Sequence, residues 1–303
     1  MLKRFGDILA MIRFSHTLFA LPFALASAVL AWRVEPFRWL DLVGILLCMV
    51  LARSAAMAFN RLVDREYDAE NPRTATRHLP TGRLSAAAVT LFAGCCVFGF
   101  IAATGLFVFS NHNWLPIFLS IPVLCFVGAY SLTKRFTALS HFWLGAALML
   151  APIATWIAIC GHFDLAVATI GTEASALIPI VLGLAVLCWV AGFDILYACQ
   201  DAAYDRKAGL HSIPARLGVP KSLRLATLCH AAMIVLLLVL WWVAGLGVVY
   251  LVGVGLVAVL LAYEHWLVRP DDLTRVNLAF FHVNSLISVG LLGIVLLDVW
   301  LGR

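Results

Sequence analysis

Three oxygen-bearing side chains recur every four residues in the stretch RSAAMAFNRLVDREYDAENPRTATRHLPTGR, which covers residues 53–83. They are Asn60, Asp64 and Asp68. On a helix, this spacing places side chains along one face about one turn apart. Arg53 precedes Asn60 by two turns of helix, so it returns to nearly the same face roughly 10 Å deeper. The pattern predicts a polar stripe that descends into an otherwise apolar helix.

A second stretch, FDILYACQDAAYDRKAG, covers residues 193–209 and has the same character. Its oxygen-bearing side chains are Asp194, Tyr197, Asp201 and Asp205. Their spacing of three, then four, then four residues would again present them on one helical face. Carboxylates gathered at two such helix ends would repel one another unless a cation lay between them. The two stretches together predict one shared cation site.

The donor atoms and the nearby basic residues indicate the chemistry of that site. An oxygen-rich cluster without His or Cys suits Mg²⁺, which commonly bridges protein carboxylates to the phosphates of a substrate. The basic residues that could bind phosphate oxygens by charge-assisted hydrogen bonds are Arg73, Arg77, Lys134 and Arg135. The nine histidines show no ligand spacing and are interpreted as packing or interface residues. The pattern predicts a Mg²⁺-diphosphate site that opens toward lipid.

The composition places these residues in a membrane protein. The 303-residue chain is 63% hydrophobic and only 12% charged, whereas soluble domains carry about a quarter charged residues. No Pro/Gly/Ser-rich linker interrupts the chain, which predicts a single membrane-embedded domain over residues 1–303. The basic residues fall in short loops between apolar runs, so the net charge of +5 does not indicate nucleic acid. The scattered cysteines lack C-x-x-C spacing and are interpreted as small packing residues.

Apolar runs long enough to cross a bilayer predict an all-α integral membrane protein with nine transmembrane helices. The runs lie near residues 14–32, 39–59, 86–109, 114–132, 138–160, 176–198, 223–244, 247–267 and 277–300. Residues 1–13 carry apolar side chains at helix-like intervals with Lys3, Arg4 and Arg13 between them, as an interfacial amphipathic helix would. A signal-peptide n-region is the alternative. Because no convincing small-residue cleavage site follows, we expect the segment to be retained.

The distribution of positive charge predicts the orientation in the plasma (inner) membrane. With a cytoplasmic N-terminus, the 21 Lys and Arg all fall on the cytoplasmic side except Arg33, Arg38, Arg53 and Arg303. Arg53 lies within a span, and the other three fall outside. This orientation puts both acidic stretches and the Lys134–Arg135 pair on the cytoplasmic face of the membrane.

Four motifs resemble those of the UbiA superfamily of membrane prenyltransferases. They are Asn60-x-x-x-Asp64-x-x-x-Asp68, Arg73-Thr-Ala-x-Arg77-x-Leu-Pro-x-Gly82, Tyr130-x-x-x-Lys134-Arg135, and Asp194-x-x-Tyr197-x-x-x-Asp201-x-x-x-Asp205 with Gly209 and Ser212. The resemblance covers nearly the whole chain and is closest to the 4-hydroxybenzoate polyprenyltransferase branch. The stretches HTLFALPFAL and AMAFNRLVDREYDAENPRTATRHLP are also similar to the related enzymes of menaquinone synthesis by the futalosine route. One departure is Arg61, where many members have Asp, which removes one acid and leaves the three spaced ligands intact.

The resemblance implies a nine-helix bundle of UbiA type and transfer of a polyprenyl group from polyprenyl diphosphate to a ring carbon of an aromatic acid. The acid would be 4-hydroxybenzoate or 1,4-dihydroxy-6-naphthoate, in ubiquinone or menaquinone biosynthesis. Two Mg²⁺ ions, which Mn²⁺ can replace, would be held by Asn60, Asp64, Asp68, Asp201 and Asp205. The diphosphate would be bound by Arg73, Arg77, Lys134 and Arg135.

The acceptor would meet three further residues. Asp194 and Tyr197 would stabilise the allylic cation or accept the ring proton, and the sequence leaves open which does which. Arg53 would bind the acceptor carboxylate, with a structural ion pair as its alternative role.

The alternative functions are a UbiA-type transferase with another lipophilic acceptor, a CDP-alcohol phosphotransferase and a cation-coupled transporter. The last two fit less well, because the compact phosphotransferase motif is missing and a transporter would place its polar residues near mid-membrane. The sequence sets neither prenyl length nor oligomeric state.

Overall fold

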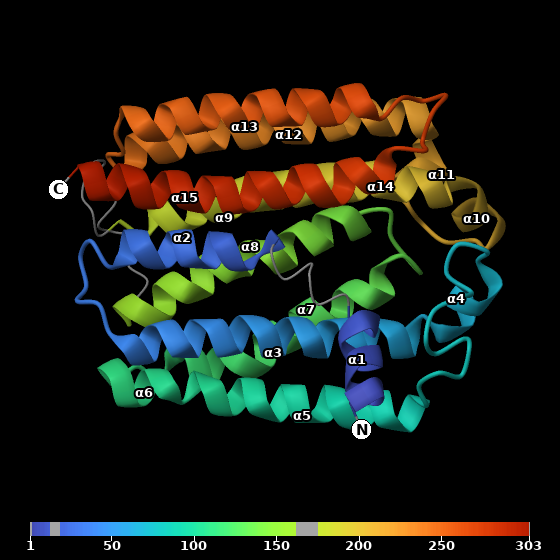
Figure 1. Ribbon diagram of the computed structural model, residues 1–303, viewed down its shortest axis with the longest axis horizontal. Coiled ribbons are helices and arrows are strands. Elements are labelled where there is room, and N and C mark those ends of the chain that lie inside the picture. The colour runs from blue at the N-terminus through green and yellow to red at the C-terminus, as the bar shows by residue number, and fades with distance from the viewer. Residues whose placement is uncertain (1, 13–18, 162–174, 303) are drawn as a thin grey trace.

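The fold is built from helices in the part of the chain that the structure describes. The computed structural model describes residues 2–12, 19–161 and 175–302. Within these ranges the only β pairing is an isolated bridge between Arg269 and Asp272. The long helices lie alongside one another in one bundle (Figure 1). The prediction of an all-α fold is confirmed.

The long helices are α3 (Trp39–Val63), α5 (Ala86–Thr104), α7 (Leu115–Thr133), α8 (Ser140–Cys160), α9 (Leu177–Ala198), α12 (Val219–Val243), α13 (Val248–Leu267) and α15 (Asn284–Leu301). The shorter ones are α1 (Leu2–Met11), α2 (Leu21–Ala31), α4 (Arg65–Glu70), α6 (Leu106–Asn111), α10 (Ala202–Lys207), α11 (Ile213–Leu217) and α14 (Val276–Leu278). A 3₁₀ turn at Cys199–Asp201 joins α9 to α10, and a π-helical turn at Ala279–Val283 joins α14 to α15.

Eight stretches of described helix are long and apolar enough to cross a membrane. They match eight of the nine predicted spans, with α6 continuing α5 and with the helix of α9 continuing to Lys207. The remaining predicted span, 14–32, contains α2, and its residues 14–18 lie outside the described ranges. The described residues thus hold eight candidate spans and the shorter apolar helix α2, which agrees approximately with the predicted count of nine. Phe98, Phe109 and Trp300 remain 75%, 80% and 72% exposed, as expected for side chains that face lipid.

Helix α9 is the centre of the bundle. Its most apolar window is 72% buried, against 11–39% for the other spans. A glycine allows α8 to pack this closely, since a Cβ at Gly145 would lie about 2.5 Å from the backbone oxygen of Leu187. Trp189 and Ile195 on α9 have no exposed surface. Asp194 and Tyr197 of the second acidic stretch are therefore carried by the most deeply buried of the spans that the structure describes.

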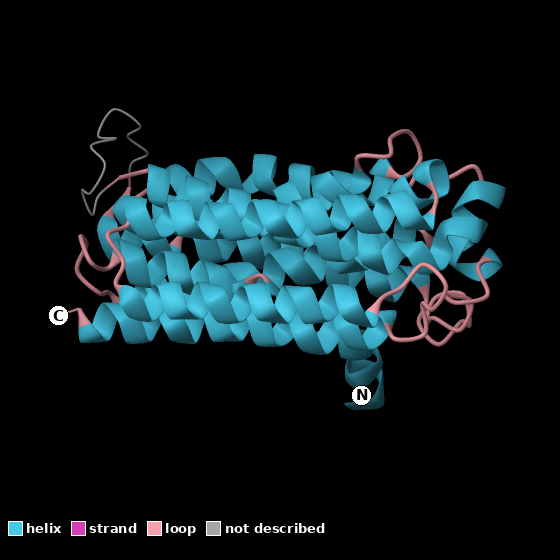
Figure 2. Ribbon diagram, turned by 90° about the horizontal axis from the view of Figure 1, so that it is seen from above, coloured by secondary structure: helices cyan, strands magenta, loops and turns pink. Residues whose placement is uncertain are grey.

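The functional stretches meet at one end of the bundle. α4, α10 and α11 lie together there, and the C-terminus lies at the opposite end (Figures 1 and 2). Helices α3, α7 and α9 all end on this side, which brings the residues after Asn60, after Tyr130 and after Tyr197 together. The predicted convergence of both acidic stretches and the Lys134–Arg135 pair at one end is confirmed. Its assignment to the cytoplasmic face stays a prediction.

Neither acidic stretch lies on an uninterrupted helix, which corrects the expectation of one continuous face. α3 ends at Val63, and α4 begins at Arg65. The amides of Asp64 and Asp68 still donate to Asn60 O and Asp64 O, at 2.9 and 2.7 Å. Because these hydrogen bonds between residues four apart persist across the break, the four-residue spacing still corresponds to helix-like backbone contacts. The second stretch is interrupted by the 3₁₀ turn that contains Asp201.

Helix α1 packs against the end of the bundle that carries the acidic stretches. Met11 and Ile12 are each 3% exposed and share a small apolar cluster with Ala58 of α3 and Val89 of α5. Figure 2 shows α1 projecting from the side of the bundle. The described part of residues 1–13 is thus helical, as predicted, and its position at a membrane interface stays a prediction.

Candidate active site

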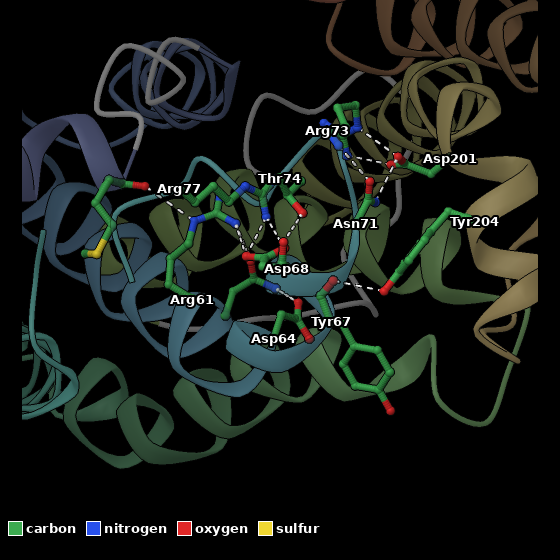
Figure 3. Close-up of polar contacts among 12 residues, drawn as sticks. Arg61, Asp64, Tyr67, Asp68, Asn71, Arg73, Thr74, Arg77, Asp201 and Tyr204 are labelled. Carbon is green, nitrogen blue, oxygen red and sulfur yellow. Dashed lines mark hydrogen bonds and ion pairs between the residues drawn. The ribbon is translucent and has the colours of Figure 1, made fainter. Parts of the chain in front are cut away.

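A cavity of about 240 Å³ lies where the two acidic stretches meet. Its wall includes every predicted site residue: Arg53, Asn60, Asp64, Asp68, Arg73, Arg77, Lys134, Arg135, Asp194, Tyr197, Asp201 and Asp205. Residues far apart in the sequence are thus brought to one space, as the motif spacing predicted. Figure 3 shows how the acids and arginines of α3, α4, the following loop and the 3₁₀ turn after α9 point toward one another.

Asp64 lies between Asn60 and Arg135. The Asn60 Nδ2 donates to Asp64 Oδ2 at 2.8 Å, and Arg135 Nη2 lies 3.5 Å from Asp64 Oδ1. Burial and the neighbouring Asp68 carboxylate raise the pKa of Asp64, against the opposing effects of Arg135 and Lys134. An added cation at this carboxylate would therefore favour its charged form.

Asp68 is held by arginines. Arg77 Nη1 lies 2.6 and 2.8 Å from its two carboxylate oxygens. Arg61 Nη1 lies 3.7 Å from Asp68 Oδ2 and 3.4 Å from Asn60 Oδ1. Thr74 Oγ1 also donates to the Asp68 backbone oxygen at 3.0 Å, which fixes the loop that carries Arg77 (Figure 3).

Asp201 joins the first acidic stretch to α9. Arg73 Nε donates to Asp201 Oδ1 at 2.8 Å, and its Nη2 bonds Oδ2. Asn71 Nδ2 donates to the same Oδ1 at 3.3 Å, and Arg73 Nη1 donates to the Tyr197 hydroxyl at 2.8 Å. Nearby, the Tyr204 hydroxyl donates to the Tyr67 backbone oxygen at 2.9 Å (Figure 3).

Asp205 is the acid with the weakest protein partner. It is 3% exposed, and Lys134 Nζ stands 4.0 Å from its Oδ2. That oxygen is buried and receives no hydrogen bond from the described residues. Burying an ionised oxygen without a hydrogen bond is unfavourable, which points to a cation as its natural partner.

As the side chains stand, the described ranges contain no group of three His, Cys, Asp or Glu close enough to hold a metal ion. The acids face arginine or lysine instead. The donor set nevertheless fits Mg²⁺, because it consists of carboxylate and amide oxygens and includes the unbonded Asp205 Oδ2. Metal binding would require these acids to exchange their basic partners for the ion.

Arg53 stands where the polar cavity adjoins an apolar one. The second cavity, of about 390 Å³, lies among α3, α5, α7 and α8, and Arg53, Met57, Asn60 and Tyr130 line both spaces. The Arg53 Nε is buried and makes no hydrogen bond to the described residues. Burying this nitrogen without a hydrogen-bond partner is unfavourable.

Two residues of this site were not expected from the sequence. Arg61 was interpreted only as a lost acid, but it is 7% exposed and adds a cation beside Asp68. His141 was interpreted as a packing residue, but its Nδ1 lies 2.7 Å from Asp194 Oδ2. The position of Arg61 inside the first motif could have indicated its role. No local pattern marks His141, because its partner lies 53 residues away.

Residues 20–286 match the UbiA prenyltransferase family. The chain belongs to the UbiA prenyltransferase family. It is 31% identical to a 4-hydroxybenzoate octaprenyltransferase of Tolumonas auensis over 77% of this chain and 75% of that protein. It is 30% identical to a protein of the same name from Alkalilimnicola ehrlichii over 86% of this chain and 83% of that one. Membership of this family excludes the phosphotransferase and transporter alternatives.

Solved structures of UbiA homologues have the same fold. An apo homologue from Aeropyrum pernix K1 has a TM-score of 0.77 and 28% identity, covering 95% of this chain and 98% of that one. A homologue from Archaeoglobus fulgidus, bound to GPP and Mg²⁺, has a TM-score of 0.68 and 18% identity, covering 95% and 99% of the two chains. This UbiA-family protein is thus a membrane prenyltransferase with the helical fold of its relatives.

Proposed function

We propose that the protein transfers a polyprenyl group from polyprenyl diphosphate to a ring carbon of 4-hydroxybenzoate or 1,4-dihydroxy-6-naphthoate, with release of diphosphate. The observation that carries the proposal is one cavity that combines acids, arginines and a lysine and adjoins an apolar space. The relatives named 4-hydroxybenzoate octaprenyltransferase support an aromatic acid as the acceptor. The product would serve the synthesis of a respiratory quinone.

The acids would bind divalent cations, with Mg²⁺ as the expected ion and Mn²⁺ as a replacement. Two ions would be held by Asn60, Asp64, Asp68, Asp201 and Asp205. The Archaeoglobus fulgidus homologue bound to GPP and Mg²⁺ supports the use of a divalent cation. When bound, the ions supply positive charge that stabilises the leaving diphosphate as the allylic C–O bond breaks.

The basic side chains would bind the phosphate oxygens that are not bound by metal ions. Arg73 and Arg77 now hold Asp201 and Asp68 through several hydrogen bonds each, and the same guanidinium geometry suits phosphate. Lys134 and Arg135 lie at the end of α7, where Lys134 faces Asp205 and Arg135 faces Asp64. The diphosphate would therefore be bound between the two acidic stretches.

The prenyl chain would extend from the polar cavity into the apolar one. The apolar space is lined by side chains such as Met49, Phe100, Phe107 and Leu119. Polar lining there is sparse, so the chain would be bound by apolar contact without a specific hydrogen bond. The aromatic faces of Phe193, Tyr197 and Phe280 line the polar cavity and would stabilise the allylic cation.

The decisive experiment supplies the purified protein with labelled polyprenyl diphosphate and each aromatic acid, and identifies the product by mass. We expect a C-prenylated acid from 4-hydroxybenzoate or from 1,4-dihydroxy-6-naphthoate, together with stoichiometric diphosphate. Prenylation of neither acid, with activity on another lipophilic phenol, would contradict the acceptor while leaving the family activity intact.

Removing divalent cations is expected to abolish transfer, because the acids alone would repel the diphosphate. The measurement is product formation in excess chelator, followed by titration of Mg²⁺ or Mn²⁺ back into the same sample. Either ion should restore activity, and Na⁺ at matched ionic strength should not. Full turnover in chelator would overturn the metal assignment.

We further infer that the whole chain forms one membrane-embedded domain in the plasma membrane, with the N-terminus and the active-site loops cytoplasmic. The excess of Lys and Arg in those loops supports this orientation. Cysteines introduced at Thr76 and Lys207, both exposed, are expected to resist an impermeant thiol reagent in sealed cells. Lys207 is preferred to Gly209, whose φ of +69° would strain any other residue.

The matched control for this labelling is Val34→Cys in the loop between α2 and α3, at the opposite end of the bundle (Figure 1). Cysteine at this position should be modified from outside, and the unsubstituted protein measures the background from its own cysteines. Modification of the Thr76 and Lys207 variants, but not the Val34 variant, in intact cells would reverse the orientation.

A further inference from the structure

His141 is a fully buried histidine in direct contact with Asp194, a residue that lines the cavity. It lies in the first turn of α8 and has no exposed surface. Its Nδ1 is 2.7 Å from Oδ2 of Asp194, a side chain of α9 that lines the cavity and remains 15% exposed. The imidazole therefore stands behind the carboxylate, on the side away from the cavity.

The other ring nitrogen of His141 fixes the direction of this hydrogen bond. The backbone N–H of Ile213, at the start of α11, donates to His141 Nε2 at 3.4 Å. A nitrogen that accepts a hydrogen bond carries no proton, so the proton of the neutral ring is assigned to Nδ1. With this tautomer, His141 donates a hydrogen bond from Nδ1 to Asp194 Oδ2.

Tyr197, one turn further along α9, is placed for a different task. Its hydroxyl accepts a hydrogen bond from the Arg73 guanidinium at 2.8 Å. Its ring centroid lies 4.5 Å from that of Phe280, at the wall of the same cavity. A neutral phenol has little basicity, whereas its ring face attracts a cation. Asp194 differs because one of its oxygens, Oδ1, receives no hydrogen bond from the described residues.

We propose that Asp194 is the group that accepts the ring proton and that His141 is the positioning residue that holds it ready to do so. The inference rests on the proposed transfer to an aromatic acid. The allylic C–O bond breaks, and its electron pair leaves with diphosphate. A π pair of the ring forms the new C–C bond. The C–H pair at the same carbon then returns to the ring, and the proton passes to Asp194 Oδ1 and later to water.

Leucine and asparagine at position 141 separate this role from simple packing. His141→Leu removes the donor to Asp194 but keeps an apolar side chain in the buried site. His141→Asn retains an amide N–H close to the position of Nδ1. Both variants are purified and their thermal unfolding is compared with that of the unsubstituted enzyme. Turnover is then measured with the active aromatic acid, both unlabelled and deuterated at its ring carbons.

We expect His141→Leu to lower kcat by about 10- to 100-fold, the effect typical of losing a group that orients a functional ligand or base. The KM for polyprenyl diphosphate should stay unchanged, because that substrate is bound elsewhere in the cavity. A primary isotope effect on the ring deuterium should appear or increase, since loss of the ring proton becomes the slow step. His141→Asn should recover most of kcat and lose the added isotope effect.

Three results would overturn the inference. One is unchanged kcat in His141→Leu, and another is a fall in kcat with no change in the isotope effect, which would mean that diphosphate or another base takes the proton. The third is equal loss in the leucine and asparagine variants. If His141→Leu does not fold, His141→Gln replaces it, because glutamine offers its amide at the position of Nε2 and still lacks the donor to Asp194. If the unsubstituted enzyme prenylates neither acid, the proposed function is wrong and the inference falls with it, an outcome distinct from the other three.

Discussion

Replacing Asp64 or Asp201 by alanine is expected to lower the rate of prenyl transfer by about 100- to 1,000-fold, the scale that accompanies loss of a main electrostatic contributor. Both side chains line the polar cavity, Asp64 directly after α3 and Asp201 in the 3₁₀ turn after α9. Each would lose a ligand for the metal ions, and each would leave a basic partner, Arg135 or Arg73, without its acid. The measurement is kcat/KM with saturating Mg²⁺.

Two controls separate chemistry from folding in this experiment. Asp201→Asn keeps the size of the side chain and can still accept a hydrogen bond from Arg73, so it should preserve the fold while losing most of the activity. Glu66→Ala removes an acid from α4 whose side chain is 82% exposed and pairs with Arg65. It should leave activity nearly unchanged. Near-normal rates in both Asp64→Ala and Asp201→Ala would mean that the site is misplaced.

Arg53→Ala is expected to raise the KM for the aromatic acid by roughly 10- to 100-fold, as loss of a charge-assisted hydrogen bond predicts. Arg53 lies between the polar and apolar cavities, and its Nε has no hydrogen-bond partner among the residues described. A guanidinium here could hold the carboxylate while the ring of the acid faces the prenyl cation. The KM for polyprenyl diphosphate should change little, and Lys134→Ala should show the reverse preference.

The geometry of the guanidinium provides a further check on Arg53. Arg53→Lys should recover only part of the affinity for the acid, because an ammonium lacks the planar pair of donors. Arg65→Ala, which removes an exposed arginine of α4, should change neither KM. If Arg53→Ala weakens both substrates equally and lowers the unfolding temperature, Arg53 is structural, and the acceptor carboxylate is bound elsewhere.

Much of the site could be predicted because its residues follow helical spacing. Asn60, Asp64 and Asp68 keep their four-residue hydrogen bonds even where the helix breaks, so the sequence pattern survives the change of direction. The two breaks lie at Asp64 and at the 3₁₀ turn containing Asp201. Neither contains a proline or glycine from which it could have been predicted. At the second break, Asn71 and Arg73 of the loop after α4 donate hydrogen bonds to Asp201, a long-range contact that a local pattern does not contain.

The residues that escaped prediction depend on partners distant in sequence. His141 lies in an apolar stretch of the sequence, and it meets Asp194 only because α8 packs closely on α9. In the sequence, Arg61 shows only that an acid is absent from the motif. The fold places Arg61 beside Asp68, where it adds a positive charge. The prediction of the cavity itself succeeded for a different reason. Membrane helices of known direction alternate sides, so the ends that carry the charged loops could be assigned to one face before any packing was known.

If the site binds a diphosphate and divalent cations as proposed, the pairing of its acids with bases makes the two ligands depend on each other. Asp68 and Asp201 are held by Arg77 and Arg73, and Asp64 and Asp205 face Arg135 and Lys134. A diphosphate that arrives alone must draw the arginines away from their acids, and a metal ion that arrives alone must draw the acids away from their arginines. When both arrive, the arginines released by the metal bind the phosphate, and the acids released by the phosphate bind the metal. The two binding free energies are therefore coupled, and each ligand should raise the affinity of the other by the same factor.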